Sequence, residues 1–148
     1  MSTEWLTAES FERNQRLISA INTLSIHTKL AREGIDNVPE VGDISEARSE
    51  LHQFLDGIGP MLHIVESDRD APLLGADQRM SLLVRQFAST RRQRPRSILH
   101  TLPVEQAALL LNSNRPAKMD LLIDYLRALR TLVEQHTYAD VVNLLGEV

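Results

Sequence analysis

The sequence predicts an all-α protein, a compact bundle of about five to seven helices in a single domain. Apolar residues recur at helical spacing in several long segments, and no segment shows the alternation expected of a β-strand. Glycine and proline, six of each, fall mainly at the breaks between apolar segments. A chain of 148 residues can form a core without disulfides, and it has no cysteine to make them.

The first predicted helix spans residues 8–32. Thr7 is its expected N-cap and Gly34 its expected C-terminal stop. Its apolar face consists of Phe11, Leu17, Ile18, Ile21, Leu24 and Leu30. Residues 34–42 follow as a predicted loop, because two glycines flank a proline and no helical period continues there.

The second helix is predicted to start at Asp43, since Asp43 and Glu46 form a variant of the capping box. The segment 56–60, Asp-Gly-Ile-Gly-Pro, is expected to interrupt this helix, because Pro60 has no N–H to donate within it. Residues 61–65 should then form another short helical piece.

A second loop is predicted around residues 67–75, and Asp77 is the expected cap of the next helix. That helix carries Met80, Leu83, Val84 and Phe87 and should end near the arginine-rich segment before Pro95.

The C-terminal third predicts three more helices, over residues 103–112, 116–136 and 138–145. Pro103 and Pro116 suit the first turn of a helix, where a missing N–H costs nothing. The long helix has a broad apolar face made of Leu122, Tyr125, Leu126, Leu129, Leu132 and Val133.

The net charge of -4 conceals a division of the chain into an acidic and a basic half. Residues 1–75 hold 13 acidic and 6 basic side chains, whereas residues 76–148 hold 7 acidic and 10 basic ones. From Arg79 to Arg130 the net charge is +7. Such asymmetry indicates either an anionic partner for the second half or attraction between the two halves, within one fold or across a dimer.

The positive charge is densest in one short segment. Arg91, Arg92, Arg94 and Arg96 place four guanidinium groups within six residues, and Pro95 keeps that part of the chain out of a regular helix. Arginines at this density can neutralise several phosphates of a nucleic acid. The alternative interpretation is a solvated connector between two core helices.

Residues 102–122 add a second candidate element. Leu102 to Pro116 reads LPVEQAALLLNSNRP, with paired alanines, paired leucines, a turn asparagine and Arg-Pro. This pattern resembles the first helix and turn of the excisionase-type helix-turn-helix, although Ser113 stands where that family has an apolar turn residue. The resemblance implies a DNA-binding element in which Arg115 and Lys118, with Met119, would face the major groove.

Other chemistries find no support in the sequence. There is no glycine-rich phosphate loop, nucleophile elbow or cysteine nucleophile, and no two of the five histidines stand three or four residues apart. We therefore expect no catalytic residue, no metal site, no cofactor and no small-molecule substrate. The apolar runs are far short of a membrane span, and the first residues do not form a signal peptide, so we expect a cytoplasmic protein without membrane association.

Two functional hypotheses remain. The first is a non-catalytic protein that binds DNA or RNA through an arginine-rich face, as a regulator or as a small subunit of a nucleoprotein complex. Its expected contact residues are Arg91, Arg92, Arg94, Arg96, Arg115 and Lys118. The second is a protein–protein interaction or scaffold module, monomeric or a homo-oligomer, whose acidic and basic faces meet.

Overall fold

The computed structural model describes residues 8–34, 43–76, 78–113 and 115–146. These residues form six helices and no strand, which confirms the predicted all-α bundle. The helices are α1 (Ala8–Arg32), α2 (Ile44–Ser67), α3 (Gln78–Gln93), α4 (Ile98–Thr101), α5 (Val104–Leu110) and α6 (Pro116–Gly146). In the part of the chain that the structure describes, no helix combines the length and the hydrophobicity that crossing a lipid bilayer requires.

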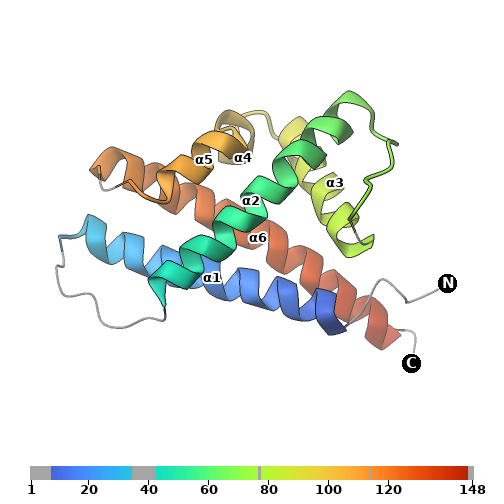
Figure 1. Ribbon diagram of the computed structural model, residues 1–148, viewed down its shortest axis with the longest axis horizontal. Coiled ribbons are helices and arrows are strands. Elements are labelled where there is room, and N and C mark those ends of the chain that lie inside the picture. The colour runs from blue at the N-terminus through green and yellow to red at the C-terminus, as the bar shows by residue number, and fades with distance from the viewer. Residues whose placement is uncertain (1–7, 35–42, 77, 114, 147–148) are drawn as a thin grey trace.

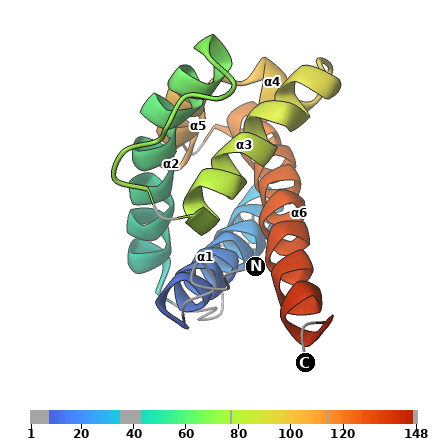
Figure 2. The same cartoon turned by 90° about the vertical axis from the view of Figure 1, so that its right-hand side faces the viewer.

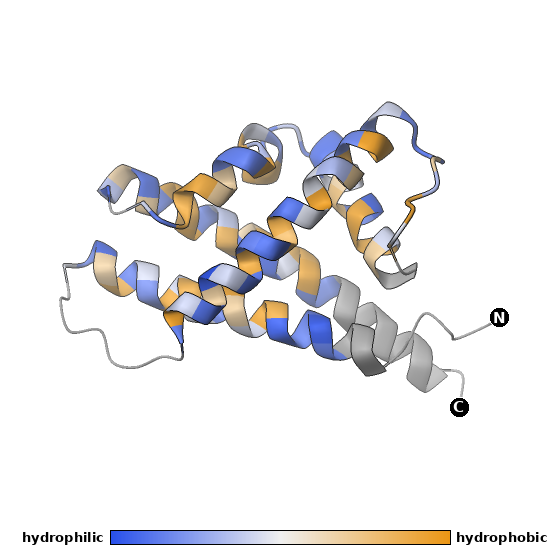
Figure 3. Ribbon diagram, viewed as in Figure 1, coloured by the Kyte–Doolittle hydropathy of each residue, from blue (hydrophilic) through white to orange (hydrophobic). Residues whose placement is uncertain are grey.

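Helices α2 and α6 organise the bundle, because the other helices pack against them. Figure 1 shows α2 crossing in front of α1 and α6. Each of α1, α3 and α5 contacts both α2 and α6. Every long helix therefore buries one face, and Figure 3 shows the resulting alternation of hydrophobic and hydrophilic residues along the ribbons.

Helix α1 has the predicted bounds. Leu17, Ile21 and Leu24 are buried, and the helix ends where Gly34 adopts a φ of 79° and its N–H donates to the carbonyl of Ala31 at 3.0 Å. Glycine suits this left-handed position because it has no Cβ to clash. The predicted cap Thr7 and residues 35–42 of the predicted loop lie outside the described residues.

The predicted break at residues 56–60 is wrong, because these residues lie inside helix α2. The Asp43 side chain caps it by accepting from the Glu46 N–H at 3.1 Å, as predicted, but the helix then runs unbroken through Pro60 to Ser67. The buried residues keep helical spacing across the proline, and they are Ala47, Leu51, Phe54, Leu55, Ile58, Leu62 and Val65.

The packing of α2 explains why the proline is tolerated. An internal proline costs about 3 kcal/mol, but burying a side chain such as Leu62 or Val65 gains about 1.5–3 kcal/mol each. Asp56, whose carbonyl loses its helical partner, lies on the exposed face together with Pro60, so water can solvate it.

Helix α3 ends within the arginine-rich segment before Pro95, as predicted, but part of that segment is helical, contrary to the expectation that Pro95 keeps it out of a regular helix. Because Pro95 restrains only the residue before it, the helix continues to Gln93 and includes Arg91 and Arg92 in its last turn. The predicted cap Asp77 lies outside the described residues. The one-turn helix α4, which the sequence reading missed, begins where the Ser97 hydroxyl accepts from the Leu99 N–H at 3.2 Å.

The C-terminal region contains two helices instead of the predicted three. Helix α5 lies within the segment predicted for it, and Pro116 opens α6. The predicted separate helix at residues 138–145 is part of α6, which continues to Gly146. No glycine or proline lies between residues 117 and 145 to interrupt the helix.

Candidate nucleic-acid interface

The four arginines of the cluster at residues 91–96 do not share one surface. Helix α3 turns by about 100° per residue, so neighbouring side chains on it point in different directions. Arg91 follows the buried Val84 and Ala88 at positions seven and three residues earlier, which places it on the inner face of α3. Arg92, one residue later, is exposed.

Arg91 takes part in an internal contact. Its Nη1 lies 2.8 Å from Oε1 of Glu66 on α2, and its side chain is only 20% exposed. This pair joins the acidic half of the chain to the basic half, as does the pair between Arg32 and Asp120 at 2.9 Å. The Arg91 side chain therefore points toward α2 and stabilises the contact between α2 and α3.

Arg92 borders a hollow between α2 and α3, here called the α2–α3 hollow. Its volume is about 520 Å³. It is lined by Val65, Arg69, Asp70, Leu82, Arg85, Gln86, Ser89 and Arg92. Three guanidinium groups thus face one carboxylate, and the net charge of this lining is positive.

Arg85 holds one wall of the α2–α3 hollow in place. Its Nη1 donates to the carbonyl of Arg69, and its Nη2 donates to the carbonyl of Ala71 at 2.7 Å. These two bonds fix the loop that follows α2 to the side of α3. Arg85 is therefore a positioning residue, and the exposed Arg69 is the side chain that it brings beside Arg92.

Arg94 borders a second hollow on the other side of α3, here called the α3–α6 hollow. Its volume is about 350 Å³, and most of its lining side chains are polar and at least partly exposed. They are Gln86, Thr90, Gln93, Arg94, Ser97, Asp124, Arg127, Thr131 and Gln135, with Leu99, Ala128 and Leu132 as the apolar members. Arg127 of α6 is thereby brought to the same hollow as Arg94.

Five exposed arginines consequently surround the outer face of α3, and we call them the α3 surface. They are Arg69, Arg92, Arg94, Arg96 and Arg127. Arg96 lies in the turn after α3, where the Ser97 N–H donates to the carbonyl of Arg94 at 2.9 Å. None of the five forms an ion pair with another described residue, so their guanidinium groups are available to a partner.

The sequence reading missed two members of this surface. Arg69 lies in the acidic segment Ser-Asp-Arg-Asp, and Arg127 lies in a long helix far from the cluster. Neither has a local signal, because only the packing of α3 between α2 and α6 brings them together.

No protein-family model, curated protein or solved structure matches this chain.

The helix-turn-helix resemblance falls on α5 and the start of α6. Its small and apolar residues Ala107, Ala108, Leu110 and Leu111 are buried. Arg115 and Lys118 are exposed and Met119 is half-buried, while Asn114 of the turn lies outside the described residues. Figure 1 shows the start of α6 at the far end of α5 from the end of α3. Arg115 and Lys118 are thus separate from the α3 surface.

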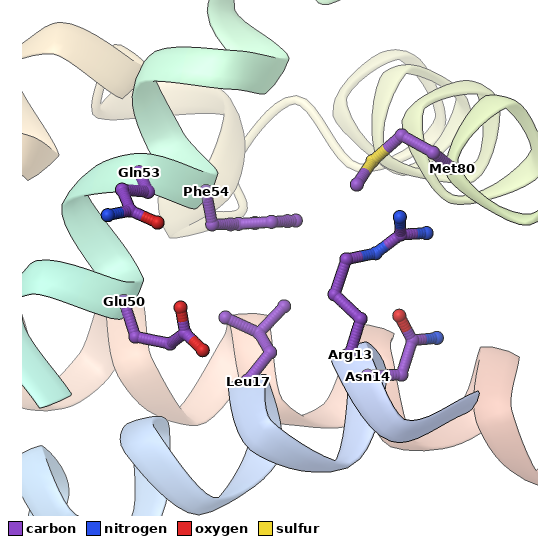
Figure 4. Close-up of a pocket in the computed structure, with 7 residues that line it drawn as sticks. All are labelled: Arg13, Asn14, Leu17, Glu50, Gln53, Phe54 and Met80. Atoms are coloured by element: carbon purple, nitrogen blue, oxygen red, sulfur yellow. The ribbon is translucent and has the colours of Figure 1, made fainter. Parts of the chain in front are cut away.

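Two further hollows adjoin both α2 and α3. One, drawn in Figure 4, has a volume of about 160 Å³ and lies between α1, α2 and α3. Phe54, Leu17 and Met80 give it apolar walls, and the charged groups of Glu50 and Arg13 lie on opposite sides. It could enclose only a small molecule, about the size that an engineered cavity of similar volume accepts.

The other hollow adjoins Arg91 and has Glu66, His63 and Glu105 in its lining. Nearby on α6, Tyr125 is 1% exposed, and its hydroxyl has no hydrogen-bond partner among the described residues. Burial raises the pKa of Tyr125, the charge of Arg91 opposes that rise, and the charge of Glu105 adds to it. Within the described ranges, no three histidine or carboxylate side chains gather in a way that could hold a metal ion.

Proposed function

We propose that this protein is a non-catalytic nucleic-acid-binding protein that contacts phosphates through the α3 surface. It would serve as a regulator or as a small subunit of a nucleoprotein complex. The single observation that supports this proposal is the convergence of five exposed arginines without ion-pair partners, drawn from four separate segments of the described chain. Arginine suits this role because its planar guanidinium can donate two hydrogen bonds to one phosphate.

The shape of the site supports a polymer as the ligand. The side chains that line both hollows are largely exposed, so an extended chain can lie across them without entering a closed cavity. Ser97 and Gln93 add a hydroxyl and an amide group that can donate to phosphate or sugar oxygens.

The experiment is a titration of the protein with labelled random-sequence DNA and RNA at two salt concentrations. Five phosphate contacts give a slope of log K against log salt near -4.5, which is a loss of about 500-fold between roughly 50 mM and 200 mM salt. Simultaneous replacement of Arg92, Arg94 and Arg96 by alanine should flatten that slope by about three. Lys29→Ala is the control, because Lys29 is an exposed cation in the last turn of α1, and Figure 1 shows that end of α1 away from α3. Absence of binding at low salt, or binding unchanged in the triple variant, would contradict the proposal.

A second candidate function is supported by a hollow between α1 and α2. It has a volume of about 200 Å³ and is lined by Arg16, Ser19, Ala20, Thr23, Asp43, Glu46, Ala47 and Glu50. Three carboxylates face one arginine there, so this acidic lining is complementary in charge to the α3 surface. In a protein–protein interaction module such as a homodimer, the acidic lining of one molecule would bind the α3 surface of another. This second function predicts a dimer in solution whose measured mass falls to that of the monomer at high salt. It also predicts that the protein does not bind nucleic acid.

A further inference from the structure

The outer face of α3 is a ridge with one hollow on each side. Gln86 lines both hollows, so the α2–α3 hollow and the α3–α6 hollow adjoin across the helix. Figure 2 shows α3 toward the viewer between α2 and α6. Leu82, Gln86 and Gln93 are exposed on this ridge. Four arginines of the α3 surface, Arg69, Arg92, Arg94 and Arg127, therefore lie in two groups, one on each side of the exposed face of α3.

The two groups lie on opposite sides of a single helix. An α-helix with its side chains is about 10–12 Å across, and the major groove of B-form DNA is about 12 Å wide. We infer that the nucleic acid bound at the α3 surface is double-stranded DNA, with α3 in its major groove and one phosphate backbone at each hollow. This inference rests on the proposed function and names the substrate of the same site.

The charges of the two hollows fit two phosphate backbones. On one flank Arg69 and Arg92 are exposed beside the carboxylate of Asp70. On the other flank Arg94 and Arg127 are exposed beside the carboxylate of Asp124. Each flank thus offers two exposed cations against one anion. A single-stranded ligand would need only one of the two flanks, whereas the two strands of a duplex use both.

The three aromatic side chains that the structure describes offer no surface for stacking bases. Proteins that bind single strands usually stack bases on exposed aromatic side chains. Phe54, Phe87 and Tyr125 are 9%, 1% and 1% exposed, so these three rings are occupied in the core. Double-stranded RNA fits the ridge less well, because the major groove of A-form RNA is deep and too narrow for side chains to read.

The ridge carries side chains that can contact base edges. Gln86 and Gln93 are exposed, seven residues apart and hence on one face of α3. Glutamine can donate to N7 and accept from N6 of adenine in the major groove. The structure thereby assigns phosphate binding to the flanks and base contact to the ridge.

The test compares one sequence in three forms: a DNA duplex of about 20 base pairs, the RNA duplex and the single DNA strand. The expected result is at least about tenfold tighter binding of the DNA duplex, given the different groove geometries. Methylation of guanine N7, which projects into the major groove, should weaken binding, and methylation of adenine N3 in the minor groove should not.

Single variants then test the two flanks. Arg92→Ala and Arg94→Ala should each weaken duplex binding about five- to tenfold near 0.1 M salt. Ethylation of phosphates should interfere on both strands with the wild-type protein, and each variant should lose interference on a different strand. Retention of the helical circular dichroism spectrum confirms that both variants fold.

The outcomes separate this inference from the proposed function. Equal or tighter binding of the RNA duplex or the single strand overturns the inference and leaves a phosphate-binding protein. Interference from minor-groove methylation alone also overturns it. Failure of all three ligands to bind overturns both.

Discussion

Arg91 and Arg92 are neighbours in sequence, but the structure predicts opposite consequences when each is replaced by alanine. Arg91→Ala removes a 2.8 Å ion pair with Glu66 and a side chain that is only 20% exposed. A fully exposed pair contributes about 0.2–1 kcal/mol, whereas breaking a fully buried pair costs about 3–5 kcal/mol. Glu66 is 37% exposed, so this pair lies between those limits, and we expect a loss of about 1–2 kcal/mol in the free energy of unfolding.

That loss corresponds to a fall in melting temperature of about 2–8 °C for a chain of this size. The nucleic-acid affinity of Arg91→Ala should stay close to that of the wild type, because Arg91 is directed inward. Arg92→Ala should do the reverse: its melting temperature should be unchanged, and its affinity near 0.1 M salt should fall about five- to tenfold. Thermal unfolding followed by circular dichroism and anisotropy titrations on the same samples measure both quantities. Equal losses of affinity in the two variants, with no change in melting temperature for Arg91→Ala, would refute the inward assignment of Arg91.

Four other predictions concern the core and its titrating groups. Because the Tyr125 hydroxyl has no partner among the described residues, Tyr125→Phe should leave the free energy of unfolding unchanged or raise it by up to about 1 kcal/mol in urea titrations. The pKa of Tyr125 is raised in the folded state, so the folded protein keeps its phenolic proton to a higher pH than the unfolded chain does. The free energy of unfolding of the wild type should therefore fall above about pH 10, and it should fall faster than that of the phenylalanine variant. Burial and, second, the charge of Arg48 lower the pKa of His27, so the unfolded chain binds a proton at this histidine more readily than the folded protein does. The free energy of unfolding should therefore fall as the pH drops below about 6.5. The fall should be smaller in His27→Gln, and urea unfolding of both proteins at about pH 7 and pH 5 measures the difference. Leu126 is 0% exposed, and Leu126→Ala should cost about 2–5 kcal/mol, whereas a cost near zero in urea titration would place Leu126 outside the core.

Much of the fold was readable from local patterns. The bounds of α1, the Asp43 cap and the start of α6 at Pro116 were predicted correctly, because each depends on residues close together in sequence. The predicted break at Pro60 was wrong for the opposite reason. The proline is a local signal, but residues on both sides of it pack into the same core, and that packing sustains one continuous helix.

The candidate site shows the same division more sharply. The sequence by itself determined an all-α chain, an acidic and a basic half, and a segment dense in arginine. Tertiary structure decided which arginines act together: it directed Arg91 to Glu66 and brought Arg69 and Arg127 to the flanks of α3. The physical reason is geometric. Charge density in a sequence depends on residues that are neighbours along the chain, whereas a surface consists of residues that are neighbours in space. The rotation of about 100° per residue in a helix points sequence neighbours in different directions. The packing of helices brings residues from distant segments together.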